Sequence, residues 1–229
     1  MQYGWVKDVP DSRDFSAKDL IFAAPALPSK FIVDPGTVIY NQGGAPSCVG
    51  FSAAGVKTDQ EFIQGRSRIT FDGNWLYKEC KKADGIPDAA GTYPRIALKV
   101  LQKQGMKIKS WLDIFGINKP DTRWSIKAYY RLDSDSDIEF IKQVIFQYGS
   151  LLCGSYWYKS WSGAREVMLA PDVSIGGHAY RISGWNPSGF LVVNSWGKSW
   201  GNKGVSIMPY DMFISRVLWG GDVWKVIDN

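Results

Sequence analysis

The sequence contains a single histidine, His178, and only three cysteines, Cys48, Cys80 and Cys153. No two cysteines have the C-x-x-C spacing, and one histidine cannot complete a zinc site of the usual kind, so we expect neither a metal nor a cofactor. Three cysteines allow at most one disulfide, and free thiols are typical of a reducing compartment. These shortages argue against a metal-stabilised or disulfide-rich protein.

The sequence also lacks a long apolar run. No stretch of about 18 apolar residues exists, so no segment is predicted to span a membrane. Residues 1–8 have neither the charged start nor the apolar core of a signal peptide. If Met1 is the true start, a cytoplasmic protein is predicted.

Charge of either sign is not concentrated anywhere. The net charge is +5, and the densest basic groups are the short segments 81–82 and 107–109. No arginine cluster stands beside aromatic residues, so we expect a solvated surface and no nucleic-acid partner. With 229 residues, 45% hydrophobic and 14% aromatic, the chain is predicted to fold around a real core as one two-lobed domain or two small ones.

A glycine-rich polar loop, residues 41–47, leads directly into a predicted helix that begins near Cys48. Ser47 is a candidate N-cap, and Cys48 lies in the first turn, where free N–H groups and the helix dipole stabilise an anion. A thiol placed there is expected to have a lowered pKa. Gln42 precedes the cysteine by six positions, and its side-chain amide could point at whatever the sulfur attacks.

A nucleophilic cysteine needs a base, and His178 is the only histidine. It follows two glycines at the start of a predicted strand. Further on, an apolar strand leads to Asn194 and Trp196, in the segment Asn-Ser-Trp-Gly. The three segments together offer a candidate thiol nucleophile, a candidate base and an asparagine among tryptophans.

These residues resemble the papain-like cysteine peptidases. The order of Gln42, Cys48, His178 and Asn194 fits that family, and the separation of Cys48 from His178 lies at the lower end of its range of about 130–150 residues. The resemblance implies an oxyanion role for Gln42, a base role for His178, an orienting role for Asn194 and a shielding role for Trp196. It also implies that Ala179, Gly154 and Tyr93 line the substrate pocket, which would suit an apolar side chain.

The sequence departs from the family signature on either side of the nucleophile. The usual cysteine three residues earlier is Ala45, and the usual aromatic residue just after it is Val49. The missing cysteine removes half of a structural disulfide and leaves the mechanism untouched. Such variants look similar to disulfide-poor bacterial or phage-type relatives.

The resemblance implies an α+β fold with a helical lobe at about residues 40–110, a β-rich lobe at about 111–215 and the active-site cleft between them. Residues 27–229 are predicted to form the peptidase domain. Residues 1–26 are predicted to form an arm that occupies the cleft as a short inhibitory prosegment or merely packs against the body.

The leading hypothesis is a monomeric cysteine endopeptidase that hydrolyses a protein or peptide substrate through a thioester acyl-enzyme. Two alternatives stay open. A transglutaminase-like acyltransferase uses the same nucleophile, although it usually carries Asp at the position of Asn194. A non-catalytic binding module of the same fold is disfavoured, because all four site residues are present.

Overall fold

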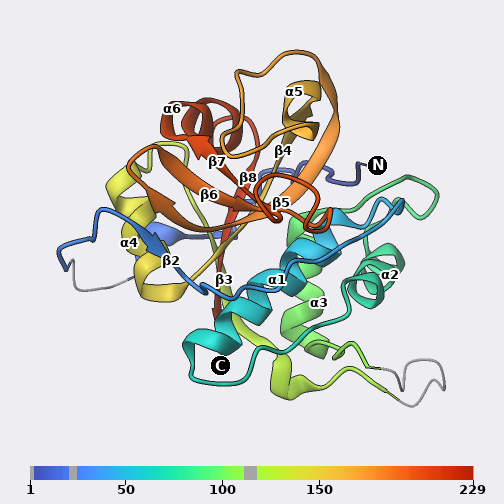
Figure 1. Cartoon of the computed structure of the whole chain (residues 1–229). Coiled ribbons are helices and arrows are strands. Elements are labelled where there is room, and N and C mark those ends of the chain that lie inside the picture. Colours follow the sequence, from blue (N-terminus) through green and yellow to red (C-terminus); the bar gives the residue numbers. More distant parts are fainter. Residues whose placement is uncertain (1–2, 21–24, 111–117, 229) are drawn as a thin grey trace.

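Helices gather on one side of the molecule and a large sheet on the other, with one long helix between them (Figure 1). The structure is a computed structural model that describes residues 3–20, 25–110 and 118–228. The predicted start of the β-rich lobe, at residue 111, lies outside this range. No helix in these segments is both long enough and apolar enough to cross a membrane.

The helical side consists of α1 (Cys48–Ile63), α2 (Gly73–Ala83) and α3 (Pro94–Gln104). Asp72 caps α2 by accepting from the backbone N–H of Trp75, and Pro94 opens α3, where a missing N–H costs nothing. Gly105 ends α3 with a positive φ of 74°. The starts of α2 and α3 therefore follow from residue types in the local sequence.

Helix α1 is buried on nearly every side, which explains its irregular apolar pattern. Its charged residues are paired: Lys57 contacts Glu61 and Asp228, and Asp59 accepts from Arg181 at 3.0 Å. Arg181 lies on the sheet, so this buried ion pair ties the central helix to it. The ion pair helps to hold Cys48, at the start of α1, in place beside the sheet.

The sheet runs in the order β1-β3-β8-β4-β5-β6-β7, with β2 paired to β5 beside this path. All pairs are antiparallel except β1 with β3. The strands are β1 (Phe15–Ser16), β2 (Phe31–Ile32), β3 (Ile126–Arg131), β4 (Leu151–Tyr158), β5 (Ser174–Asn186), β6 (Gly189–Val193), β7 (Val205–Pro209) and β8 (Asp222–Asp228). The shorter helical segments are η1 (Ala17–Asp19), η3 (Thr122–Trp124), α4 (Ile138–Tyr148), α5 (Lys159–Ser162), α6 (Tyr210–Phe213) and η4 (Ile214–Leu218).

Helix α4 ends at Gly149 and leads into β4, and a two-residue turn between Asn186 and Gly189 joins β5 to β6. Strand β5 begins earlier than predicted, because Gly176 and Gly177 pair with Trp157 and Tyr156 on β4. Strand β8 was not predicted, although it lies between β3 and β4. The division into residues 1–26 and 27–229 stays a prediction.

Two hydrophobic cores support this arrangement. One lies among the sheet, α4 and the segment Tyr210–Leu218, and the other joins α1, α2 and α3 to the inner ends of β4, β5 and β8. Cys48 and Ala179 both belong to the second core. The fold therefore brings the start of α1 against the part of β5 that carries His178.

Candidate active site

Cys48 is the first residue of α1 and is fully buried. Ser47 occupies the N-cap position, as predicted, but its side chain makes no capping hydrogen bond, and its hydroxyl lies 3.5 Å from Oδ1 of Asn74. Burial raises the pKa of the Cys48 thiol to about 11, and the nearby backbone of Ala179 and Gly4 only partly opposes this change. The predicted lowering of this pKa is wrong for this state, because loss of water outweighs the helix start.

His178 lies on β5, directly before Ala179, whose backbone partly opposes the rise in the pKa of Cys48. Its Nε2 lies 2.8 Å from Oδ1 of Asn194, which also accepts from the backbone N–H of Ser195 at 2.7 Å. The Oδ1 of Asn194 therefore faces the imidazole and favours the tautomer with the proton on Nε2. Nδ1 of His178 is buried and has no hydrogen-bond partner within the described residues.

Tryptophans enclose the imidazole. The ring of Trp196 lies 4.5 Å from that of His178, centroid to centroid, and the ring of Trp157 lies at 4.7 Å. Burial among these rings lowers the pKa of His178 to about 4, and the bond to Asn194 only partly opposes that change. These two shifts favour a neutral thiol and a neutral imidazole in this state.

Gln42 is placed by a residue that the sequence analysis did not single out. Ser195 donates its hydroxyl to Oε1 of Gln42 at 2.6 Å, and its carbonyl accepts from the backbone N–H of Gln42 at 2.8 Å. Nε2 of Gln42 donates to the carbonyl of Ala45 at 2.8 Å. Ser195 therefore couples Gln42 to Asn194, and its place directly after Asn194 was the only signal in the sequence.

The N-terminal arm crosses this site. The backbone N–H groups of Gly4 and Trp5 donate to the carbonyl of Gly177, while Thr92 donates to the carbonyl of Gly4, each at 2.9 Å. The ring of Tyr3 meets His178 and Trp196 edge-on, at 6.3 and 6.2 Å. The arm thus bonds to both walls beside the sulfur.

Glycines make room for the arm at every point of close approach. A Cβ on Gly154 or Gly177 would lie 2.1 or 2.4 Å from atoms of Trp5, and one on Gly91 would lie 2.3 Å from the carbonyl oxygen of Gly4. Gly4 itself has no room for a Cβ, which would lie 1.9 Å from the carbonyl oxygen of Pro46. Such a matched set of glycines indicates a built seat for the arm.

The predicted pocket residues fall on both walls. Ala179 and Gly154 are directly paired across β5 and β4, and Gly154 pairs in turn with Asp222 on β8. Tyr93 stands at the N-cap of α3, where its neighbour Thr92 supplies the backbone bonds to the arm. Asp222 was missed, because the predicted lobe ended before it.

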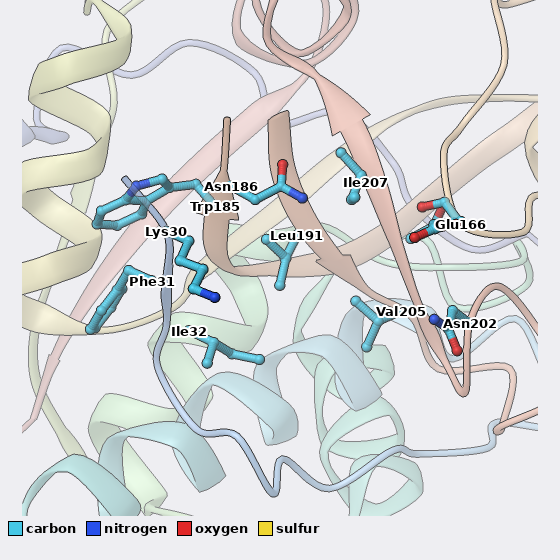
Figure 2. Close-up of a pocket in the computed structure, with 11 residues that line it drawn as sticks. Lys30, Phe31, Ile32, Glu166, Trp185, Asn186, Leu191, Asn202, Val205 and Ile207 are labelled. Atoms are coloured by element: carbon cyan, nitrogen blue, oxygen red, sulfur yellow. The ribbon is translucent and has the colours of Figure 1, made fainter. Parts of the chain in front are cut away.

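A large open groove lies elsewhere, over β6 and β7. It has a volume of about 570 Å³, and Figure 2 shows Lys30, Leu191 and Val205 around it. Its lining contains neither cysteine nor histidine. Within the described segments, no group of three His, Cys, Asp or Glu side chains is arranged to hold a metal ion.

Comparison with known proteins identifies the class. A family model described as papain family cysteine protease matches residues 34–212. This is most of the chain, so the protein belongs to that family and is a cysteine peptidase. An uncharacterised peptidase C1-like protein of Acanthamoeba polyphaga mimivirus is 25% identical over an alignment of 270 residues, covering 98% of this chain and 86% of the relative.

Solved structures agree. Xylellain, a cysteine protease from Xylella fastidiosa, is 25% identical with a TM-score of 0.82, covering 99% of this chain and 96% of its own. Procathepsin B S9 from Trypanosoma congolense, at 17% identity and a TM-score of 0.70, shares the fold over 100% of this chain and 87% of its own. The predicted papain-like α+β fold is confirmed, whereas its bacterial or phage-type origin stays a prediction.

Proposed function

We propose that the protein is an endopeptidase that cleaves peptide bonds through Cys48, His178 and Asn194. The observation that carries this proposal is the bond from His178 to Asn194, made under Trp196, with Cys48 and the neighbouring Ala179 in one hydrophobic core. This is the arrangement of nucleophile, base and orienting group that thiol catalysis needs.

In the proposed reaction, Nδ1 of His178 takes the thiol proton and the sulfur of Cys48 bonds to the carbonyl carbon of the substrate. The backbone N–H of Cys48 and the amide of Gln42 hold the oxyanion, and losing one such donor typically costs about 10²–10³ in rate. The imidazolium returns the proton to the leaving amine as the C–N bond breaks. Water then attacks the thioester, which releases the acid and restores the thiol.

We further propose that the N-terminal arm inhibits this reaction. The backbone N–H groups of Gly4 and Trp5 donate to the carbonyl of Gly177, directly before His178, so the arm is held against the strand that carries the base. The arm therefore lies across the site through backbone hydrogen bonds. Arm residues also help to bury Cys48 and His178, so docking favours the neutral, unreactive pair.

Opening of the arm reverses these electrostatic effects. Water that enters the cleft solvates the charged forms, so the pKa of Cys48 falls and that of His178 rises. The start of α1 then stabilises the thiolate. Cys48 and His178 thus form a reactive pair when the arm is open and a protected, neutral pair when the arm is docked.

The test uses the full chain, its Cys48→Ser variant and a library of quenched peptides. We expect the wild-type chain to release free carboxylic acids and Cys48→Ser to release none, with an epoxide forming one adduct on Cys48 by mass spectrometry. Cys80 and Cys153 serve as internal controls, because both are buried and burial raises the pKa of each thiol. Transfer of the acyl group to an added amine in preference to water would instead indicate an acyltransferase.

A further inference from the structure

A buried carboxylate stands in the pocket that the arm fills. Asp222 is 1% exposed and lies in one row with Gly154 and Ala179 across three neighbouring strands. Side chains of directly paired residues share a face of the sheet. On this face of the sheet, the methyl group of Ala179, the open place beside Gly154 and the carboxylate of Asp222 therefore lie side by side.

The indole of Trp5 occupies the open place. It is 6% exposed, its Nε1 donates to Oδ2 of Asp222 at 2.9 Å, and its ring meets that of Tyr156 edge-on at 5.6 Å. The seat fits the ring closely, since a Cβ on Gly154 would lie 2.1 Å from both Cδ1 and Nε1. The pocket thus matches an indole in size and in its one polar atom.

When the arm leaves, Asp222 loses two donors at the same oxygen. Oδ2 accepts from Nε1 of Trp5 and from the backbone N–H of Asp8, each at 2.9 Å, whereas Oδ1 keeps its bond to Arg131 at 2.8 Å. A buried acceptor without a partner is costly, so the empty pocket favours a ligand that supplies a donor at this point.

We propose that Asp222 makes this pocket select a tryptophan side chain of the substrate, through a hydrogen bond from the indole N–H. The inference rests on the proposed peptidase function and names its preferred substrate class. A neutral donor suits the site better than a cation, because Arg131 already pairs with Asp222. The guanidinium groups of Arg95 and Arg131 also lie close by, each 5.3 Å from the ring of Trp224. A substrate arginine or lysine would meet like charges there.

The test compares peptides that differ in one atom. In a set of fluorogenic peptides, each position before the cleaved bond in turn is Trp or 3-benzothienylalanine, in which sulfur replaces the indole N–H. We expect kcat/KM to be about tenfold or more higher for Trp, since a site built to bond an N–H rejects the analogue that lacks it. Arm docking lowers kcat/KM for both peptides by one common factor, so the ratio is measured on the full chain.

A size control uses two glycines of the same lobe. Gly154→Ala places a methyl group in the indole seat and is expected to remove the preference for Trp over Val, whereas Gly163→Ala, with nothing within 4 Å of its Cβ, leaves the preference intact. If Gly154→Ala does not fold, the comparison of the two peptides on the wild-type chain still decides.

Equal rates for the two peptides, or a preference for Arg or Lys over Trp, would overturn the assignment of Asp222 while leaving the peptidase intact. Absence of cleavage of every peptide in the library, by the wild-type chain and by a Gly4→Ala chain with a displaced arm, would overturn the proposed function itself. The two failures are therefore distinguishable.

Discussion

The two grooves of this molecule differ in what they hold. The groove over β6 and β7 is open, about 570 Å³ in volume, and its lining contains neither cysteine nor histidine. The groove beside Cys48 holds the chemical groups and is filled by residues 3–8 of the same chain. A large open groove therefore does not by itself mark the active site, since a chain can cover its own active site.

The filled groove is also the more specific one. Its contacts are backbone bonds, a buried carboxylate and glycines that fit the arm atom by atom. The open groove mixes apolar side chains with Lys30, Glu166 and Asn202. The following predictions test whether function follows the chemical groups or the open volume.

The largest effect is expected at the base. His178→Gln removes the group that takes the proton of Cys48, so kcat/KM should fall by about 10³-fold or more. The measurement is steady-state cleavage of the best library peptide, with circular dichroism as the control for folding. A variant that keeps more than a tenth of the activity would remove His178 from the mechanism.

The next effect concerns the arm. Gly4→Ala forces a methyl group to within 1.9 Å of the carbonyl oxygen of Pro46, so the arm should dock less tightly. Weakening the docking by about 1.4 kcal/mol raises the open fraction tenfold, and we expect kcat/KM to rise by at least that factor. Gly163→Ala is the matched control, and unchanged activity of Gly4→Ala would show that the arm does not inhibit.

A pH effect should come from Asp8 on the arm. Burial and the nearby carboxylate of Asp222 raise the pKa of Asp8 from 3.8 to about 7, and Arg95 and the indole N–H of Trp224 oppose this change. The docked arm therefore keeps a proton that the free arm releases near pH 4. Docking is strongest below that pH and weakens as pH rises toward 7.

The measurement is the rate at which an epoxide labels Cys48, taken as the ratio of wild type to Asp8→Asn. The variant cannot release this proton, and the thiol's own titration divides out of the ratio. We expect the ratio to rise by about fiftyfold between pH 5 and pH 7 and to level above about pH 8. A flat ratio would show that Asp8 does not control docking.

The smallest effect is expected in the open groove. Lys30→Gln removes a charge from an exposed side chain that lines it, and surface changes of this kind usually alter stability by less than about 0.5 kcal/mol. Cleavage of the library peptides should stay within twofold of wild type. A larger loss would give the open groove a part in substrate binding and break the contrast between the two grooves.

Much of the scaffold followed from local pattern. Asp72 before a helical run, Pro94 at a helix start and a turn between Asn186 and Gly189 each act over a few residues, so their elements could be predicted closely. Strand β8 could not, because its middle is buried through pairing with two distant strands and contains Lys225, which donates to the carbonyls of Tyr148 and Ser150. A buried lysine interrupts the hydrophobic pattern from which a strand is predicted.

Within the site, residue types were predictable and their states were not. The order of Cys48, His178 and Asn194 was visible in the chain, and so was the polar loop that carries Gln42. The roles of Ser195 and Asp222 depend on contacts across more than 150 and 200 positions, to Gln42 and to Trp5. No local pattern encodes such contacts.

The sequence by itself determined which chemistry is possible, because a lone imidazole, a thiol at a helix start and a strand-end asparagine are matters of composition and short-range order. Only the tertiary structure decided that the pair is neutral with the arm docked, since a pKa depends on how much water surrounds a group. It likewise decided that the arm bonds to the strand that carries His178 and that Asp222 faces an indole. Those facts arise where distant segments meet.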